Sequence, residues 1–170
     1  MSAAATDRAL RDAFGCFATG VTLVTTHWNG QDWGMTCSSF NAVSLDPALV
    51  LWNIRHNATS HEAFVRSSGY TVSVLGSEHQ ELAQAFARGS QAERFAAGEF
   101  VRLDSQRLKL VPALAWFDCK LYQTVQAGDH DILLGQIEHY GSRPGKGLVF
   151  ERGQFAVDTL ETGAASTSPF

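Results

Sequence analysis

The sequence predicts a mainly β protein, an antiparallel barrel or α+β fold with a few short helices. Segments typical of strands outnumber the helical segments, and the two kinds do not alternate as they do in a Rossmann sheet. Two turn signals, Asn29-Gly30 and Gly128-Asp129, each lie between strand-like segments. Because such tight turns join antiparallel neighbours, they favour hairpins and an antiparallel sheet.

Size and composition are those of an ordinary globular protein. The chain has 170 residues, of which 45% are hydrophobic and 18% are charged. We therefore expect one domain over residues 1–170. Its ordered core is expected at about 8–157, and the small, polar residues 161–170 are expected to form a flexible tail.

Charge, hydropathy and cysteine usage exclude several classes of protein. The net charge is −4 and no basic block stands out, which argues against a nucleic-acid binder. The longest apolar run, 48–52, is far shorter than the ~20 residues that a membrane span needs. Three cysteines without a CxxC spacing argue against a disulfide framework or a structural zinc. Without a signal-peptide pattern, a cytoplasmic protein is the default expectation.

The N-terminal part predicts one helix and two strands. A helix is expected over 6–19, because apolar residues recur at i, i+3, i+4 and i+7 from Leu10. A β-branched strand follows over 21–26. After the Asn29-Gly30 turn, a second strand is expected over 31–45.

The middle of the chain predicts two strands and two short helices. Asp46-Pro47 breaks the chain before a continuous apolar strand at 48–54, which we expect to be covered on both faces. The capping-box patterns Thr59-x-x-Glu62 and Ser77-x-x-Gln80 open the two helices. A further strand is expected between them, at 70–75.

The C-terminal part predicts a long hairpin. Residues 89–100 before it have a mixed, loop-like pattern. Alternating apolar positions predict a half-buried strand over 114–125, and its hairpin partner is expected over 130–140. A polar loop at 142–147 precedes the last ordered segment, 148–155.

The sequence contains no strong motif for acid–base, nucleophilic or metal catalysis. The G-x-G-x-x-G, H-E-x-x-H and nucleophile-elbow patterns are absent, and residues 141–147 lack the spacing and the hydroxyl of a P-loop. Histidines such as His56, His61 and His139 show no ligand spacing, so no metal site is predicted.

One constellation of polar side chains does stand out. Thr36, Ser38 and Ser39 lie on one predicted strand, Asn53 ends the next one, and Thr59-Ser60 begin a helix. Hydroxyls and free N–H groups at a helix start bind anions without a lysine, so this set fits a phosphate, with Asn53 recognising a polar ring edge. On spacing alone, solvated strand hydroxyls and simple helix caps are the more frequent explanation.

His130 and the three cysteines carry weaker signals. A lone histidine beside a hairpin turn is more often a surface residue than a catalyst, which leaves the role of His130 open. Cys16, Cys37 and Cys119 lie on apolar-patterned elements and are expected to be small core residues.

A series of stretches is specific in its order, although no single one is decisive. The series comprises 20–26 (GVTLVTT), 34–40 (GMTCSSF), 44–47 (SLDP), 70–75, 80–86, 93–95, 113–119, 128–130 (GDH) and 150–155 (FERGQF). It closely resembles the flavin reductase-like family, the small reductases that serve two-component flavin monooxygenases. The resemblance covers about 10–157.

This resemblance implies a split β-barrel of the FMN-binding type, usually a homodimer with flavin near the subunit interface. The residues that it places around the flavin ring, ribityl chain and phosphate are Gly34, Met35, Thr36, Ser38, Ser39, Asn53, Ile54, Arg55, Thr59, Ser60, Ala85, Phe86 and Arg94. Those that it places on the nicotinamide side are His130, Phe150, Arg152 and Gly153.

The activity implied by the resemblance is transfer of a hydride from NADH or NADPH to FMN or FAD. His130 would orient the nicotinamide carboxamide or relay a proton, of which orientation is favoured, and a separate monooxygenase of the aromatic hydroxylase type would receive the reduced flavin. Because a cofactor supplies this chemistry, the absence of a catalytic triad is consistent with it. Two alternatives stay open: a flavin-dependent reductase of another acceptor, such as a corrinoid or metal chelate, and a non-catalytic flavin-binding module.

Overall fold

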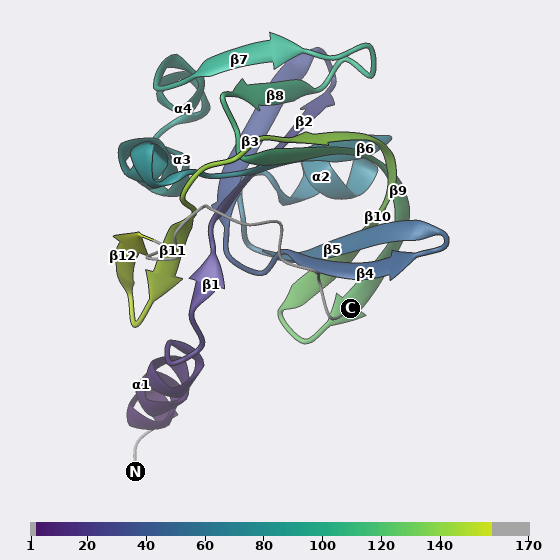
Figure 1. Cartoon of the computed structure of the whole chain (residues 1–170). Helices are drawn as coiled ribbons and strands as arrows, with labels where there is room; N and C mark the ends of the chain where they lie inside the picture. The colour runs from purple at the N-terminus through teal and green to yellow at the C-terminus, as the bar shows by residue number, and fades with distance from the viewer. Residues whose placement is uncertain (1–2, 158–170) are drawn as a thin grey trace.

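A seven-stranded antiparallel sheet organises the protein, in the order β3-β2-β6-β9-β10-β5-β4 (Figure 1). The computed structural model describes residues 3–157, so the tail predicted at 161–170 lies outside the described residues. The strands are β2 (Thr22–Trp28), β3 (Gln31–Cys37), β4 (Asn41–Leu45), β5 (Ala48–Arg55), β6 (Gly69–Val74), β9 (Ala115–Ala127) and β10 (His130–Ser142). The predicted mainly β, antiparallel fold class is confirmed.

The connection between β3 and β4 shows that this sheet is rolled. These two strands are its opposite edges, yet residues 38–40 alone join them. A flat sheet of seven strands would separate its edges by roughly 29 Å, whereas the short connection spans at most about 14 Å. The sheet therefore curves back on itself as a split barrel. The continuous strand predicted over 31–45 is wrong, because the chain changes edge at 38–40.

Two smaller sheets flank the large one. One has the order β1-β11-β12, from β1 (Thr19–Gly20), β11 (Leu148–Glu151) and β12 (Gln154–Val157). The other is the hairpin of β7 (Glu99–Arg102) and β8 (Leu108–Val111), which the sequence pattern did not predict.

Helices fill the connections between strands. They are α1 (Ala3–Phe14), α2 (His61–Arg66), the 3₁₀ turn η1 (Ser77–His79), α3 (Gln80–Arg88) and α4 (Gln91–Ala96). Helix α4 lies in the segment predicted as mixed, and it begins with a capping box: Ser90 N–H donates to Glu93 Oε2 at 2.8 Å. Neither predicted capping box forms. Helix α2 starts after Ser60 without a side-chain cap, and Gly76 N–H donates to His79 Nδ1 instead.

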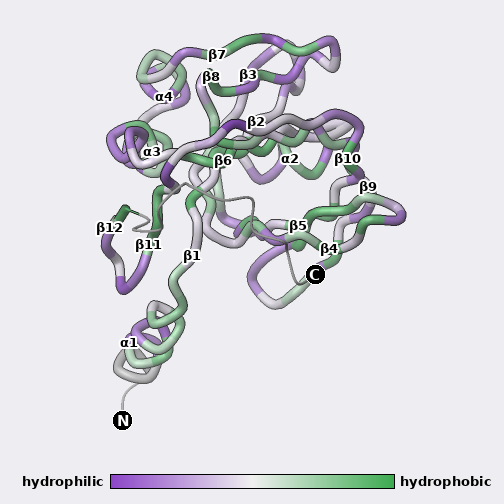
Figure 2. The backbone as a smooth tube through the Cα atoms, in the orientation of Figure 1, coloured by the Kyte–Doolittle hydropathy of each residue, from purple (hydrophilic) through white to green (hydrophobic). Residues whose placement is uncertain are grey.

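Two groups of buried residues stabilise the rolled sheet. In the first, the rings of Trp52 and Phe64 meet edge to face at 4.8 Å, so that α2 packs against the sheet. In the second, Phe86 of α3 packs against Phe95 and Phe100. Figure 2 shows the hydrophobic stretches of β6 and α2 in the interior of the molecule. Within residues 3–157, no helix has the length and hydrophobicity required to cross a membrane.

A buried ion pair joins Arg107, the residue just before β8, to Asp118 of β9. Arg107 Nε is 2.7 Å from Asp118 Oδ1, and the two residues are 4% and 1% exposed. The hydroxyl of Thr71 donates to the same carboxylate oxygen at 3.0 Å. Buried charges are tolerated when they are paired and hydrogen-bonded, and both conditions hold for Arg107 and Asp118.

Helix α1 projects from the lower end of the molecule (Figure 1). It ends at Phe14 rather than at Thr19 as predicted, because the chain turns at Gly15 and enters β1. The apolar residues that predicted it are exposed: Leu10 by 52%, Phe14 by 69% and Phe17 by 77%. The described residues of a single chain thus leave this apolar surface uncovered.

Candidate functional site

A hollow of about 330 Å³ opens where the rolled sheet brings the end of β3 close to the end of β5. The first residue of β10 completes it, because His130 pairs with Arg55 in the sheet. The lining residues are Met35, Thr36, Cys37, Ser38, Ser39, Asn53, Arg55, Ala58 and His130. All but Cys37 and Ala58 are residues proposed from the sequence, and they come from three separate segments.

Ser39 and Asn53 connect the two walls of this hollow. The backbone N–H of Asn53 donates to Ser39 Oγ at 2.9 Å. The side-chain oxygen of Asn53, Oδ1, is buried and has no hydrogen-bond partner among the described residues. Since an unpaired buried acceptor costs free energy, it points to a donor that a ligand would bring. A heteroaromatic N–H or a sugar-like hydroxyl fits this position.

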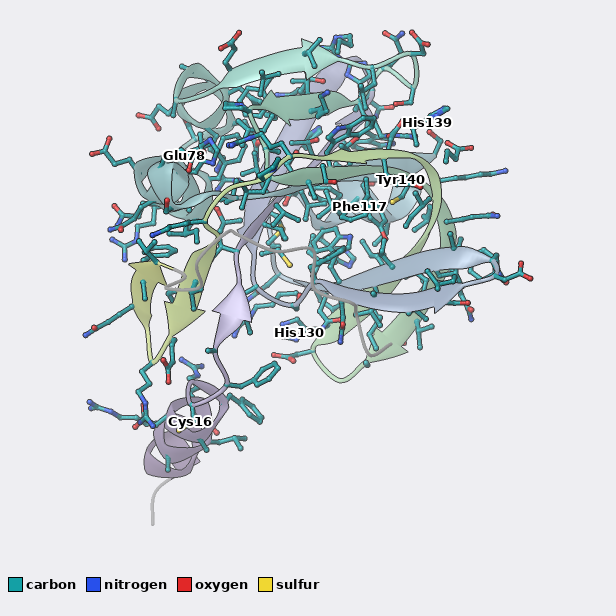
Figure 3. All side chains as sticks on the ribbon, in the orientation of Figure 1. Cys16, Glu78, Phe117, His130, His139 and Tyr140 are labelled. Carbon is teal, nitrogen blue, oxygen red and sulfur yellow. The ribbon has the colours of Figure 1, made fainter. Side chains whose placement is uncertain are left out.

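His130 lies at the mouth of the hollow, half-buried. Its Nδ1 is 2.7 Å from Asp129 Oδ1, and this hydrogen bond holds the pKa of the Asp129 carboxyl below its ordinary value. Figure 3 shows His130 far from His139 and Tyr140, which lie toward the other end of the same strand. The structure therefore provides an oriented imidazole next to the polar cavity.

Several residues proposed for the site support it from behind instead of lining it. Arg94 Nη1 donates to the carbonyl of Gly34 at 2.7 Å. Phe86 is fully buried, and a Cβ placed on Gly34 would lie 2.6 Å from its ring. Ala85 belongs to the same helix α3, and Ile54 is fully buried in the core. These residues fix the position of β3 and β5.

The hydroxyls proposed for a phosphate differ in whether they are free to contact a ligand. Thr36 lines the hollow, but its hydroxyl donates to the carbonyl of Ala83 at 2.6 Å. Ser60 is 2% exposed, and its hydroxyl lies 3.8 Å from Met35 Sδ. Thr59 is exposed. Ser38 lines the hollow and is exposed, whereas the Ser39 hydroxyl, which also lines it, already accepts from Asn53 N–H; Thr59 is not among the lining residues.

A second hollow, of about 660 Å³, adjoins the first and shares Ser38 with it. It lies between α1 and the β11–β12 hairpin, where Arg152 N–H donates to the carbonyl of Gly15 at 2.8 Å. Its lining residues are Arg11, Asp12, Phe14, Gly15, Phe17, Thr19, Ser38, Phe150, Arg152 and Gly153. Phe150, Arg152 and Gly153, proposed for the nicotinamide side, thus line this adjoining hollow, whereas His130, proposed with them, lines the first one.

A larger hollow, of about 740 Å³, lies elsewhere. It is lined by Leu103, Asp104, Ser105, Trp116, Asp118, Glu138, His139 and Tyr140. None of these residues was proposed from the sequence, and its acidic groups do not suit a phosphate. The larger hollow also has an unpaired buried oxygen, Ser105 Oγ, so the choice rests on charge: we favour the smaller hollow, where the unpaired Asn53 Oδ1 and hydroxyls lie beside Arg55.

The cysteines are not reactive groups of this site. Burial raises the pKa of the Cys37 thiol, and burial raises that of Cys119 to about 12. Both thiols are thus neutral core groups at ordinary pH. Cys16 is exposed, contrary to the prediction, because α1 ends before it and the chain turns there.

The structure also assembles a cluster that no spacing in the sequence indicates. His56 and His61 both contact the carboxylate of Asp131, and the hydrogen bond from His61 holds the pKa of that carboxyl below its ordinary value. Seventy residues separate His61 from Asp131 in the chain. The antiparallel pairing of β5 with β10 brings them together.

Residues 14–157 match the family model described as the flavin reductase like domain. The chain belongs to this family. The resemblance seen in the sequence is therefore confirmed, and the rolled antiparallel sheet agrees with the solved structures of other flavin reductase-like proteins.

Three relatives illustrate how closely this flavin reductase-like chain matches others. It is 42% identical over 149 residues to the reductase component of the flavin-dependent trigonelline monooxygenase of Acinetobacter baylyi, covering 87% of this chain and 48% of the relative. It is 35% identical to the FMN reductase (NADH) SmoA of Agrobacterium fabrum, covering 87% and 84%. The structure of the NADH:FAD oxidoreductase SgcE6 of Streptomyces globisporus, in complex with NAD and FAD fragments, superposes with a TM-score of 0.83 at 32% identity, covering 96% of both chains.

Some of these relatives are much longer than this flavin reductase-like chain. It spans 48% of the trigonelline monooxygenase reductase component and 52% of a probable flavin reductase of Rhizobium meliloti, so about half of each. Others, such as SmoA, are of similar length, with 84% covered.

Proposed function

We propose that the chain is an NAD(P)H:flavin oxidoreductase that delivers reduced FMN or FAD to a partner monooxygenase. Family membership supports this reaction, and the unpaired Asn53 Oδ1 in the 330 Å³ hollow is the structural observation that carries it. In this proposal the flavin, when bound, supplies the chemistry by accepting a hydride from the nicotinamide.

The chain's own residues bind and orient the two ligands. Asn53 Oδ1 accepts a hydrogen bond from the flavin ring or the ribityl chain, and Ser38 and Ser39 offer hydroxyls beside it. In this proposal Arg55, which lines the hollow, and the exposed Thr59 bind the flavin phosphate. Met35 forms part of the apolar wall, and its Sδ lies 3.8 Å from the Ser60 hydroxyl.

The second hollow receives the nicotinamide nucleotide. Ser38 lies on both hollows, so a ligand there can reach one held in the first. Phe150 and Gly153 form its wall, and Arg152 provides positive charge for the phosphates of NADH or NADPH. Holding the two rings together removes much of the entropic barrier to the reaction.

A second copy of the chain is part of this proposal. The exposed apolar side chains of Leu10, Phe14 and Phe17 need a cover, and a homodimer supplies one beside the second hollow. Sedimentation velocity measures this state directly. We further propose that the chain forms one domain and acts in the cytoplasm, where the reduced nicotinamide nucleotides are available.

A turnover assay tests the function. Purified protein is mixed with NADH and an excess of FMN or FAD, and the nicotinamide absorbance is followed. We expect oxidation of many equivalents of NADH per chain. Binding of flavin without its reduction would support a non-catalytic module, and turnover with a corrinoid or metal chelate in preference to free flavin would support another acceptor.

Replacing His130 with alanine should impair use of the nicotinamide nucleotide. Because His130 is proposed to orient that ring, we expect kcat/KM for NADH to fall by about tenfold or more, with a smaller change in flavin affinity. His139→Ala is the matched control, since His139 is exposed on the same strand but outside both hollows. Unchanged kinetics in His130→Ala would make His130 an ordinary surface residue.

A further inference from the structure

Three side chains next to the proposed flavin site converge on one point. His56 Nε2 is 3.2 Å from Asp131 Oδ1, and His61 Nε2 is 2.7 Å from Asp131 Oδ2. The potential ligand atoms of all three residues lie within 4.8 Å of one another. The two imidazole rings are 5.5 Å apart and nearly perpendicular, which lets both nitrogens face the same carboxylate.

The backbone holds this cluster in place from three elements. Asp131 is the second residue of β10 and pairs with Ile54 of β5. The N–H of His56, just after β5, donates to the carbonyl of Asp129 at 3.0 Å. His61 is the first residue of α2, whose Phe64 is fully buried. The backbone of the fold therefore positions these three side chains next to one another.

The chemistry of the donor set suits a particular class of ion. Two imidazole nitrogens and one carboxylate are typical ligands of zinc and similar transition metals, with a fourth position left to water. At bond lengths of about 2.0–2.1 Å, tetrahedral ligand atoms lie about 3.4 Å apart. His56 Nε2 lies 3.2 Å from Asp131 Oδ1, near this value, whereas His61 Nε2 lies 2.7 Å from the other oxygen, Oδ2, so the His61 ring must move outward by several tenths of an ångström to admit an ion. The side chains of His56, His61 and Asp131 are 36%, 22% and 13% exposed, so an ion can reach them from solvent.

We propose that His56, His61 and Asp131 form a binding site for a divalent transition metal of the zinc type. Magnesium and calcium are poor occupants, because they prefer oxygen ligands. The prediction of no metal site, made from sequence spacing, missed this arrangement because β5 and β10 join distant segments.

The position of the cluster links it to the hollow, and this part of the proposal rests on the proposed flavin site. His56 follows Arg55, Asp131 follows His130, and Ala58 lies between the two histidines; all three neighbours line the hollow. A bound cation joins the loop to β10 and offsets the charge of Asp131 near the proposed flavin phosphate. Metal should therefore raise the affinity for FMN severalfold, and FMN should raise that for metal by the same factor.

Metal binding is tested first on flavin-free protein without an affinity tag. Zinc is titrated against a chromophoric chelator, and we expect one equivalent per chain, without competition from magnesium. His61→Ala and Asp131→Asn should each weaken zinc binding by at least about tenfold, while His139→Ala should bind as the unchanged protein does. His56→Gln provides a third variant at an exposed position, and thermal unfolding without metal shows whether each variant is folded.

The outcomes separate the metal site from the flavin site. Equal zinc binding by the folded variants and the unchanged protein would overturn the metal site. If zinc binds as expected but leaves FMN affinity unchanged, the coupling is overturned and the site stands. If FMN fails to bind with or without zinc, the proposed function fails while the zinc titration still supports the site.

Discussion

Replacing Asp118 with alanine is expected to lower the free energy of unfolding by about 3–5 kcal/mol. The substitution removes the carboxylate that lies 2.7 Å from Arg107 Nε. The guanidinium of Arg107, a residue that is only 4% exposed, then stays buried without this partner. It also removes the acceptor of the Thr71 hydroxyl. Urea unfolding measures the change, which should appear as a lower transition midpoint.

Glu138→Ala provides the matched control for this prediction. Glu138 Oε2 is 3.5 Å from Arg107 Nη2, but its side chain is 46% exposed. A solvent-exposed partner of this kind contributes about 0–1 kcal/mol. Similar losses in Asp118→Ala and Glu138→Ala would contradict the assignment of the buried pair as the main electrostatic contact of Arg107.

Replacing Asn53 with leucine is expected to weaken flavin binding by between about 5- and 150-fold. The estimate corresponds to the 1–3 kcal/mol lost when a ligand donor is left without its buried acceptor. Asn53 Oδ1 has no other partner among the described residues, so the effect should fall on the ligand more than on folding. A titration of FMN followed by its fluorescence gives the dissociation constant.

Tyr140→Leu tests whether the correct hollow has been chosen. Tyr140 is 74% exposed and borders the larger, 740 Å³ hollow. FMN affinity should be unchanged in this variant. If FMN affinity falls in Tyr140→Leu and is normal in Asn53→Leu, the flavin binds in the larger hollow and the assignment is wrong.

Local patterns in the sequence were sufficient for two of the hairpins, β2–β3 and β9–β10. Asn29 and Gly30 both have positive φ angles, as the predicted tight turn requires. The hairpin of β9 and β10 was likewise set by the turn at Gly128. These features depend on neighbouring residues, which is why a single sequence could predict them.

Features that depend on the rolling of the sheet could not be predicted in this way. The break at 38–40 appears only when β3 and β4 become opposite edges. The same closure decides that Ser39 meets Asn53, whereas Phe86 and Arg94 lie behind the wall. Family resemblance proposed residues that the fold brings around one hollow, but the division between lining and supporting residues required three-dimensional packing.

A crystal structure of the protein soaked with FMN tests the central claim most directly. We expect the flavin ring in the hollow between β3 and β5, with a hydrogen bond to Asn53 Oδ1 and with Ser38 and His130 beside it. Flavin density in the hollow bordered by Tyr140, with the space between β3 and β5 empty, would contradict the account.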